Sequence, residues 1–208
     1  MSEHYSFELI SFDITNTRSR HDDTDYTSFH LAVKNKNGGI RTYKQVKFNG
    51  NLNNGTYPIG LSFHDIAVES DEHIVMNYLI VNNGHEKGDS VAAELEKAGD
   101  ELATKGAEAA GTAAGAAIGS AIPIPGIGTA IGAVAGWLAS KLGGLLFADC
   151  DGPVAAEQVT LSAKELAKRV EQSHGNYEVK THHPGTDSPD GCGSNSEYDV
   201  TWAIRRRN

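Results

Sequence analysis

The chain has 208 residues, a formal net charge of −9 at pH 7 with neutral histidines, and a pI near 5.4. This length allows one hydrophobic core, or one core with an appended helical segment. The acidic charge argues against nonspecific nucleic-acid binding, whose sites are basic. The first residues lack a charged stretch followed by an apolar run. The sequence therefore predicts synthesis in the cytoplasm without a signal peptide, with any release by a non-Sec route.

The first part of the chain alternates apolar and polar side chains in short runs, the pattern of half-buried β-strands. The predicted strands are residues 7–15, 26–33, 42–48, 57–61, 63–68 and 73–81. Turn signals separate them at Asn37-Gly38-Gly39 and Asn53-Asn54-Gly55. Pro58 indicates an edge strand or the start of a strand. Strands at this spacing favour an antiparallel sandwich or barrel.

A helical period replaces this alternation from Ser90 onward. One face of the predicted helix is formed by small or apolar residues, namely Val91, Leu95, Ala98, Leu102 and Ala109. Gly99 and Gly106 interrupt the helix as weak points. The pattern predicts a surface helix that covers the sheet and leads into a glycine-rich segment.

This glycine-rich segment, residues 109–147, is the most distinctive stretch of the chain. Its glycines recur every fourth residue in two sets, Gly111, Gly115 and Gly119, then Gly128, Gly132 and Gly136. Four-residue spacing places each set on one helical face, where backbones can approach closely. Pro123-Ile124-Pro125-Gly126 lies between the sets and permits a reversal of the chain. We predict a helical hairpin whose arms pack glycine face to glycine face.

The hairpin requires either a protein interior or a lipid one, because no side chain from Ala109 to Ser140 ionises. The second arm, residues 127–147, contains Trp137, Leu138 and Leu142 and reaches the length of about 20 residues that spans a bilayer. The first arm is shorter and has few large apolar residues. Insertion therefore requires packing between arms or between subunits, and a buried hairpin in a protein core or oligomer interface is the alternative.

The last part of the chain returns to β pattern over residues 154–161, 177–183 and 198–204. Ser162 and Glu165 form a capping-box signature for a short helix. We therefore predict an α+β fold, an antiparallel β-sandwich with an inserted glycine-rich α-helical hairpin. Residues 1–84 form its first part, residues 85–150 the helical insertion, and residues 151–208 the remainder of the sandwich.

Aspartates in three loops are candidate ligands for Ca²⁺, which takes oxygen ligands in flexible coordination. They are Asp22, Asp23 and Asp25 in the first loop, Asp149 and Asp151 in the second, and Asp187 and Asp190 in the third. Aspartate is also common in turns for local reasons. Cys150 and Cys192 allow a single bridge, although in a reducing compartment they would more often remain free thiols. Nine histidines could respond together to acid.

Motifs for nucleophilic catalysis, phosphate binding and zinc binding are missing from the sequence, which favours a non-enzymatic protein. Residues 111–144 resemble the glycine-zipper hairpins of pore-forming bacteriocins and, in layout, the hydrophobic hairpin of colicin-type toxins. This resemblance covers about a fifth of the chain, and the β portion matches no named family.

Together these features give a leading hypothesis. The protein is a soluble toxin-type molecule that inserts its hairpin into the membrane of a target cell as a homo-oligomeric pore, triggered by pH or oligomerisation. The alternative is a binding or assembly module, in one form calcium-dependent and lectin-like, whose hairpin completes a core or an oligomer interface.

Overall fold

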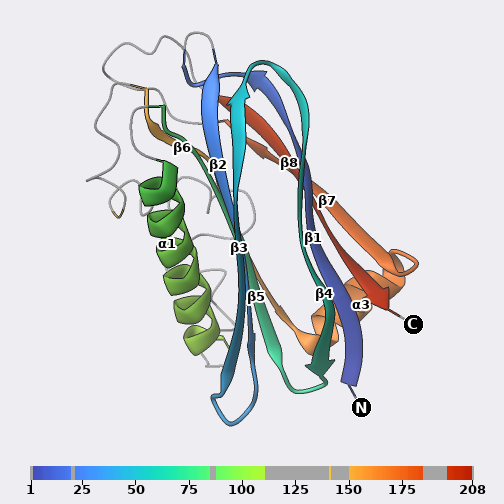
Figure 1. The fold of residues 1–208 in the computed structure, drawn as a ribbon. Coiled ribbons are helices and arrows are strands. Elements are labelled where there is room, and N and C mark those ends of the chain that lie inside the picture. Colours follow the sequence, from blue (N-terminus) through green and yellow to red (C-terminus); the bar gives the residue numbers. More distant parts are fainter. Residues whose placement is uncertain are drawn as a thin grey trace.

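The computed structural model describes residues 2–19, 22–84, 88–110, 141, 150–184 and 196–207. These residues form two antiparallel four-stranded sheets with two α-helices, an α+β fold of sandwich type (Figure 1). Sheet A contains, in spatial order, β4 (Gly55–Glu69), β1 (Ser2–Asn16), β8 (Glu197–Arg207) and β7 (Asn176–His183). Sheet B contains β3 (Ile40–Leu52), β2 (Asp23–Lys34), β5 (His73–Asn82) and β6 (Gly152–Ser162).

The main core lies between the two sheets and is filled by alternate side chains of each strand. Phe7, Leu9 and Phe12 of sheet A are fully buried there, as are Phe29 and Leu31 of sheet B. The last strand adds the inward-facing residues predicted from its alternation, Val200, Trp202 and Ile204. The β pattern on both sides of the insertion therefore contributes to one core.

Strand β4 corrects the predicted division of residues 57–68 into two short strands. It is one long strand with irregularities where Gly60 and Asp65 adopt positive φ angles of 68° and 57°. Its pairing with β1 shifts register between Leu9 and Ser11, next to the pair Ser11 and Pro58. Such bulges interrupt the period-two pattern without ending a strand. The edge position predicted from Pro58 is confirmed, because β4 borders sheet A.

The two described helices occupy different sides of the sandwich (Figure 1). Helix α1 (Gly88–Ala109) lies on the outer face of sheet B, which confirms the predicted surface helix over the sheet. Its buried face extends to Ala107 and Ala110, whereas Ala109 is only half-buried, contrary to prediction. Helix α3 (Ala163–Gln172) links β6 to β7, and its buried Leu166 and Val170 join the main core.

The helical insertion leaves and re-enters the sandwich at adjacent positions. It connects β5 to β6, which are antiparallel neighbours, and its flanking residues Asn82 and Gly152 are paired in the sheet. The sandwich strands on either side of the insertion are thus joined by direct pairing. Of the predicted hairpin, the structure describes Ala109, Ala110 and Lys141 alone, so its two glycine sets lie outside the described residues.

Removing the N-cap of α3 tests how firmly this helix closes the core. Ser162 accepts a hydrogen bond from the Glu165 backbone, and Glu165 bonds back to the Ser162 backbone. We expect Ser162→Ala to lower the free energy of unfolding by about 1 kcal/mol in urea denaturation. Lys164→Ala, at an exposed position of the same turn, is the control and should change it by less than about 0.5 kcal/mol. Equal effects would contradict a capping role.

Candidate functional site

The interface between helix α1 and the outer face of sheet B is the described region that could control the insertion. A second apolar cluster lies here, separate from the main core, and it consists mainly of small residues. Its buried members are Ala32, Val75, Ala103, Ala107 and Ala110. Small side chains bury little apolar area, and hydrophobic stabilisation scales with that area. This cluster brings the helix close to the sheet while burying little apolar area, and Val91, Leu95 and Leu102 add larger buried side chains to the same helix.

Gly99 makes the closest approach between helix and sheet. A Cβ atom built on Gly99 would lie 2.1 Å from Nε2 of His30, so the glycine leaves the space that the imidazole ring occupies. Asn77, paired with His30 on the neighbouring strand, donates a hydrogen bond of 3.1 Å from Nδ2 to the Gly99 carbonyl. His30 and Asn77 are both fully buried beneath the helix. The predicted weak point of the helix is thus a docking position.

Gly106 repeats this arrangement two helical turns further along. A Cβ atom placed on Gly106 would lie 2.8 Å from Cγ1 of Val75 and 2.9 Å from Nε2 of Gln158. A separation of seven residues returns nearly to the same helical face. The two glycines therefore let the backbone of α1 approach strands β2, β5 and β6 along one line.

Several polar atoms in this interface are buried and have no hydrogen-bond partner among the described residues. They are Ser28 Oγ, both ring nitrogens of His30, Asn77 Oδ1 and Gln158 Oε1. Ser28 lies two residues before His30 on β2, on the same face of the strand. A buried polar group left without a partner costs roughly 1 to 3 kcal/mol. The helix is docked at an energetic cost.

Charged contacts at the periphery offset part of this cost. Lys44 of β3 forms a 2.8 Å ion pair with Glu96 of α1. Lys34 of β2 donates from Nζ to the carbonyl oxygens of Glu108 and Ala110, which end the helix. Lys141, in the predicted second arm, pairs with Glu101 of α1 at 2.9 Å. The last contact attaches that position of the insertion to the helix.

Burial determines the electrostatics of His30. Desolvation lowers the pKa of its imidazole from 6.5 to about 4, Glu96 acts in the opposite direction, and Lys44 reinforces the decrease. A histidine with a depressed folded-state pKa stabilises the docked form above the unfolded pKa of about 6.5. That stabilisation decreases as the pH falls from 6.5 towards 4, because an undocked His30 binds a proton more readily.

The predicted calcium ligands fall into three groups. Asp23, Asp25 and Asp151 are buried near one end of the sandwich, Asp22 is exposed, and Asp149, Asp187 and Asp190 lie outside the described residues. Asp23 accepts hydrogen bonds from the backbone amides of Arg18 and Ser19, both at 2.7 Å, which fixes the preceding loop. Among described residues, no cluster of three histidine, cysteine or acidic side chains is placed to hold a metal. The calcium hypothesis stays a prediction.

Asp25 shares a buried tyrosine hydroxyl with Asp23. The Tyr198 hydroxyl lies 2.8 Å from Asp23 Oδ2 and 2.9 Å from Asp25 Oδ2. One hydroxyl proton cannot serve both contacts. Burial and the neighbouring Asp23 raise the pKa of Asp25 well above its usual value. The side chains of Asp23, Asp25 and Tyr198 therefore form a buried hydrogen-bond network with a structural role.

A second buried polar network crosses the main core and was not predicted. One oxygen of Glu157 accepts hydrogen bonds from Tyr78, Thr181 and Trp202 at 2.8, 2.9 and 3.1 Å. The Tyr78 hydroxyl is also 2.6 Å from Nε2 of His183, and burial lowers the pKa of this histidine to about 4. These bonds join β5, β6, β7 and β8, so the network connects the two sheets.

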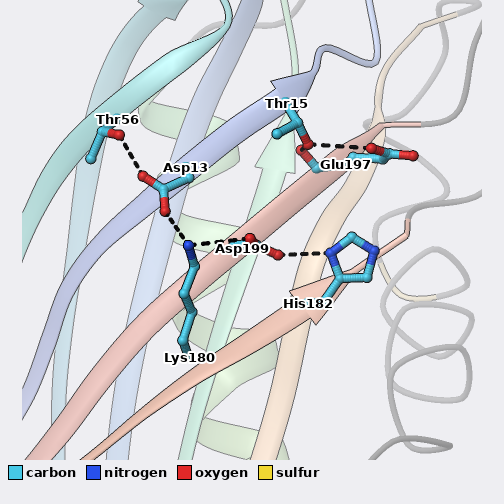
Figure 2. Close-up of polar contacts among 7 residues, drawn as sticks. All are labelled: Asp13, Thr15, Thr56, Lys180, His182, Glu197 and Asp199. Atoms are coloured by element: carbon cyan, nitrogen blue, oxygen red, sulfur yellow. Dashed lines mark hydrogen bonds and ion pairs between the residues drawn. The ribbon is translucent and has the colours of Figure 1, made fainter.

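The outer face of sheet A carries an exposed polar network, drawn in Figure 2. Asp13 and Asp199 are directly paired on β1 and β8, and Lys180 of β7 approaches both, at 2.6 and 3.2 Å. Thr56 donates to Asp13, and His182 lies 2.7 Å from Asp199. The pKa of each carboxyl is lowered, chiefly by Lys180 and Thr56 at Asp13 and by His182 and Lys180 at Asp199, where burial opposes the decrease. This face thus carries an exposed network of ion pairs and hydrogen bonds.

Two further findings concern the predicted cysteines and the membrane. Cys150 is disulfide-bonded, which differs from the free thiol expected in a reducing compartment, and Cys192 lies outside the described residues. Neither helix in the described part of the chain is long and apolar enough to cross a membrane.

The described residues define an α+β fold of sandwich type with helix α1 docked on the outer face of sheet B. Comparison of the chain with family models and with curated proteins finds no match.

The residues of the α1 interface were only partly accessible to sequence analysis. His30, Asn77 and Gln158 lie in predicted strands, where burial beneath a helix leaves no distinct pattern. The one signal in the sequence was the seven-residue spacing of Gly99 and Gly106 on an otherwise apolar helical face.

Substitution of Gly99 tests the close approach to His30. On an exposed helix, glycine to alanine stabilises by about 1 kcal/mol. Here the clash with His30 reverses the sign, and we expect Gly99→Ala to destabilise the docked helix by roughly 1 to 3 kcal/mol. Hydrogen exchange of α1 amides measures this.

The double variant His30→Ala/Gly99→Ala removes the ring and should restore protection of α1 relative to Gly99→Ala. Gly84→Ala is the control, because among the described residues its Cβ would meet Thr24 alone, at an ordinary 3.5 Å. Greater protection in Gly99→Ala than in the unmodified protein would contradict the close contact.

Lys180→Met tests the network on sheet A. Without the ammonium group the paired carboxylates repel each other, so we expect NMR titration to show higher pKa values for Asp13 and Asp199. Because depressed carboxyl pKa values stabilise the fold above about 3.8, the variant should lose stability at a higher pH during acid unfolding. Glu178→Gln, on the same strand, is the control and should leave both pKa values unchanged.

Proposed function

We propose that the protein is a toxin-type molecule that delivers a glycine-zipper helical hairpin into a target membrane and forms an oligomeric pore there. The observation that carries this proposal is the α1–sheet B interface. The helix that leads into the glycine-rich segment packs through small residues over buried polar atoms that lack partners among the described residues. Such an interface favours a helix that can leave the sheet without unfolding the sandwich.

The position of the insertion supports the same function. Because Asn82 and Gly152 are paired neighbours, the chain leaves and returns at one point of sheet B. The main core between the sheets includes residues from both sides of the insertion. A detached insertion would therefore stay tethered to a sandwich whose strands remain paired.

The chemistry of residues 109–140 supports a membrane as the destination. This stretch contains no ionisable side chain, and its two glycine sets would allow close helix packing in lipid. Bilayers lack water to satisfy backbone groups, which helices satisfy internally. The disulfide at Cys150 agrees with action outside a reducing cytosol.

Leakage from vesicles tests this function. We expect the full-length protein to release dye from phosphatidylcholine–phosphatidylglycerol vesicles at pH 5, and Gly115→Leu to reduce release several-fold by separating the packed arms. Ala113→Leu is the matched control, since residue 113 lies about 200° from residue 115 around a helix. It should retain release.

Two outcomes would contradict the proposal. Absence of leakage at both pH 7 and pH 5 would favour the alternative, an assembly or binding module that keeps its hairpin buried. If Gly115→Leu and Ala113→Leu lose dye release equally, leakage does not depend on packing through the glycine sets.

A further inference from the structure

We propose that His30 and Gly99 form an acid-sensitive switch, in which protonation of His30 undocks helix α1 from sheet B and frees the insertion. This inference rests on the proposed function, because it names the regulation of the segment that would enter the membrane. The undocking of α1 by acid can be measured without any membrane.

The geometry leaves a protonated His30 without compensation. Its side chain is fully buried between β2 and the backbone of α1 at Gly99. Neither ring nitrogen has a partner among the described residues, and the nearby Gly99 carbonyl already accepts from Asn77. A charged imidazole has two N–H donors, so protonation would add a charge and a second unsatisfied donor at a sealed position.

The charged groups around His30 do not neutralise it. Helix α1 contributes Glu96 as the main carboxylate near the ring, with Asp100 one turn further on. Strand β3 contributes Lys44, which lies opposite His30 and forms the 2.8 Å ion pair with Glu96. Strand β5 contributes the uncharged Asn77. Desolvation outweighs the attraction of Glu96 for a charged His30, and the repulsion of Lys44 acts in the same direction as desolvation.

The pH range of the switch follows from these groups. Desolvation holds the pKa of buried His30 near 4, compared with 6.5 for an exposed ring. Undocking should therefore become up to about tenfold more favourable per pH unit below 6.5, and about 300-fold in all before levelling off near pH 4. The carboxyl pKa values of Asp13, Glu101 and Asp199 are lowered, so these surface pairs stay ionised through most of this interval.

His183 is the other buried histidine with a pKa near 4, and its location separates its effect from that of His30. It lies in the main core and contacts Tyr78 of β5. Protonation of His183 would loosen the sandwich itself, whereas protonation of His30 would loosen α1 alone. A measurement that resolves α1 from the strands distinguishes the two.

Hydrogen exchange of the disulfide-intact, full-length protein at pH 7, 6 and 5, corrected for intrinsic exchange rates, provides this measurement. We expect the opening of residues 91–107 to increase up to about tenfold per pH unit below 6.5, with a smaller change in β2 and β5. His30→Gln keeps a polar side chain that cannot ionise, and its α1 opening should not vary with pH. His30→Met is a second variant with the same expectation should the first fold poorly.

His182→Gln, on the exposed face of sheet A, is the control and should behave like the unmodified protein. The switch is refuted if α1 opening in the His30 variants depends on pH as it does in the unmodified protein. It is equally refuted if α1 and the strands open together at every pH.

Vesicle leakage then separates a failure of the switch from a failure of the proposed function. If both are right, Gly99→Ala leaks at pH 7, and His30→Gln leaks no more at pH 5 than at pH 7. Acid-induced leakage that is identical in His30→Gln and the unmodified protein would refute the switch but would still support pore formation. Acid undocking that depends on His30, with no leakage in any variant, would support the switch and refute the pore.

Discussion

The docking of α1 over His30 is the contact on which the proposed release of the insertion depends. It combines a very close backbone approach at Gly99 with a buried ring that has no hydrogen-bond partner in the described part of the molecule. Close packing normally stabilises an interface, but here it seals a titratable group away from water. The same contact therefore holds the helix at neutral pH and opposes docking once a proton is available.

The sandwich does not share this weakness. Its main core contains large aromatic and aliphatic side chains from both sheets, including Trp202, Phe29 and Phe7, all nearly inaccessible to solvent. Its internal polar groups are bonded across strands, as with Glu157, which accepts from three donors. Buried polar atoms without a partner among the described residues occur in both regions, including Nδ1 of His183 between the sheets, so the two regions differ chiefly in the size of their apolar clusters. The difference predicts local opening of the helix before global unfolding.

Much of the fold could be predicted because its strands obey a simple period. The alternation of Val200, Trp202 and Ile204 identifies the inward face of β8 without knowledge of the partner strand. In β1 the period fails, because the register shift between Leu9 and Ser11 brings Phe12 to the same core as Leu9, whereas strict alternation would place them on opposite faces. The capping box at Ser162 was predictable for the same local reason. The continuity of β4 was not, since bulges at Gly60 and Asp65 interrupt the period while leaving the pairing with β1 in place.

The candidate site could not be predicted because it depends on contacts distant in sequence. His30 and Gly99 are 69 residues apart, and nothing local to either residue reports the other. The glycines of α1 were interpreted as weak points because propensity is a local property, while their role here is to admit side chains from sheet B. The glycine sets and the calcium hypothesis depend on residues that lie partly or wholly outside the described part of the chain.

The composition of the outer face of sheet B suits two states of the molecule. When α1 is docked, Ala32 and Val75 bury apolar surface against Ala103 and Ala107. When α1 leaves, water can satisfy the polar atoms that docking leaves without partners among the described residues, namely Ser28 Oγ, both His30 ring nitrogens, Asn77 Oδ1 and Gln158 Oε1. A fully apolar face would bind the helix permanently and would aggregate if exposed. A fully polar face would not bind it. The mixture of apolar and polar side chains lowers the free-energy difference between docked and undocked α1. A small difference is required if the binding of one proton is to shift the equilibrium from one state to the other.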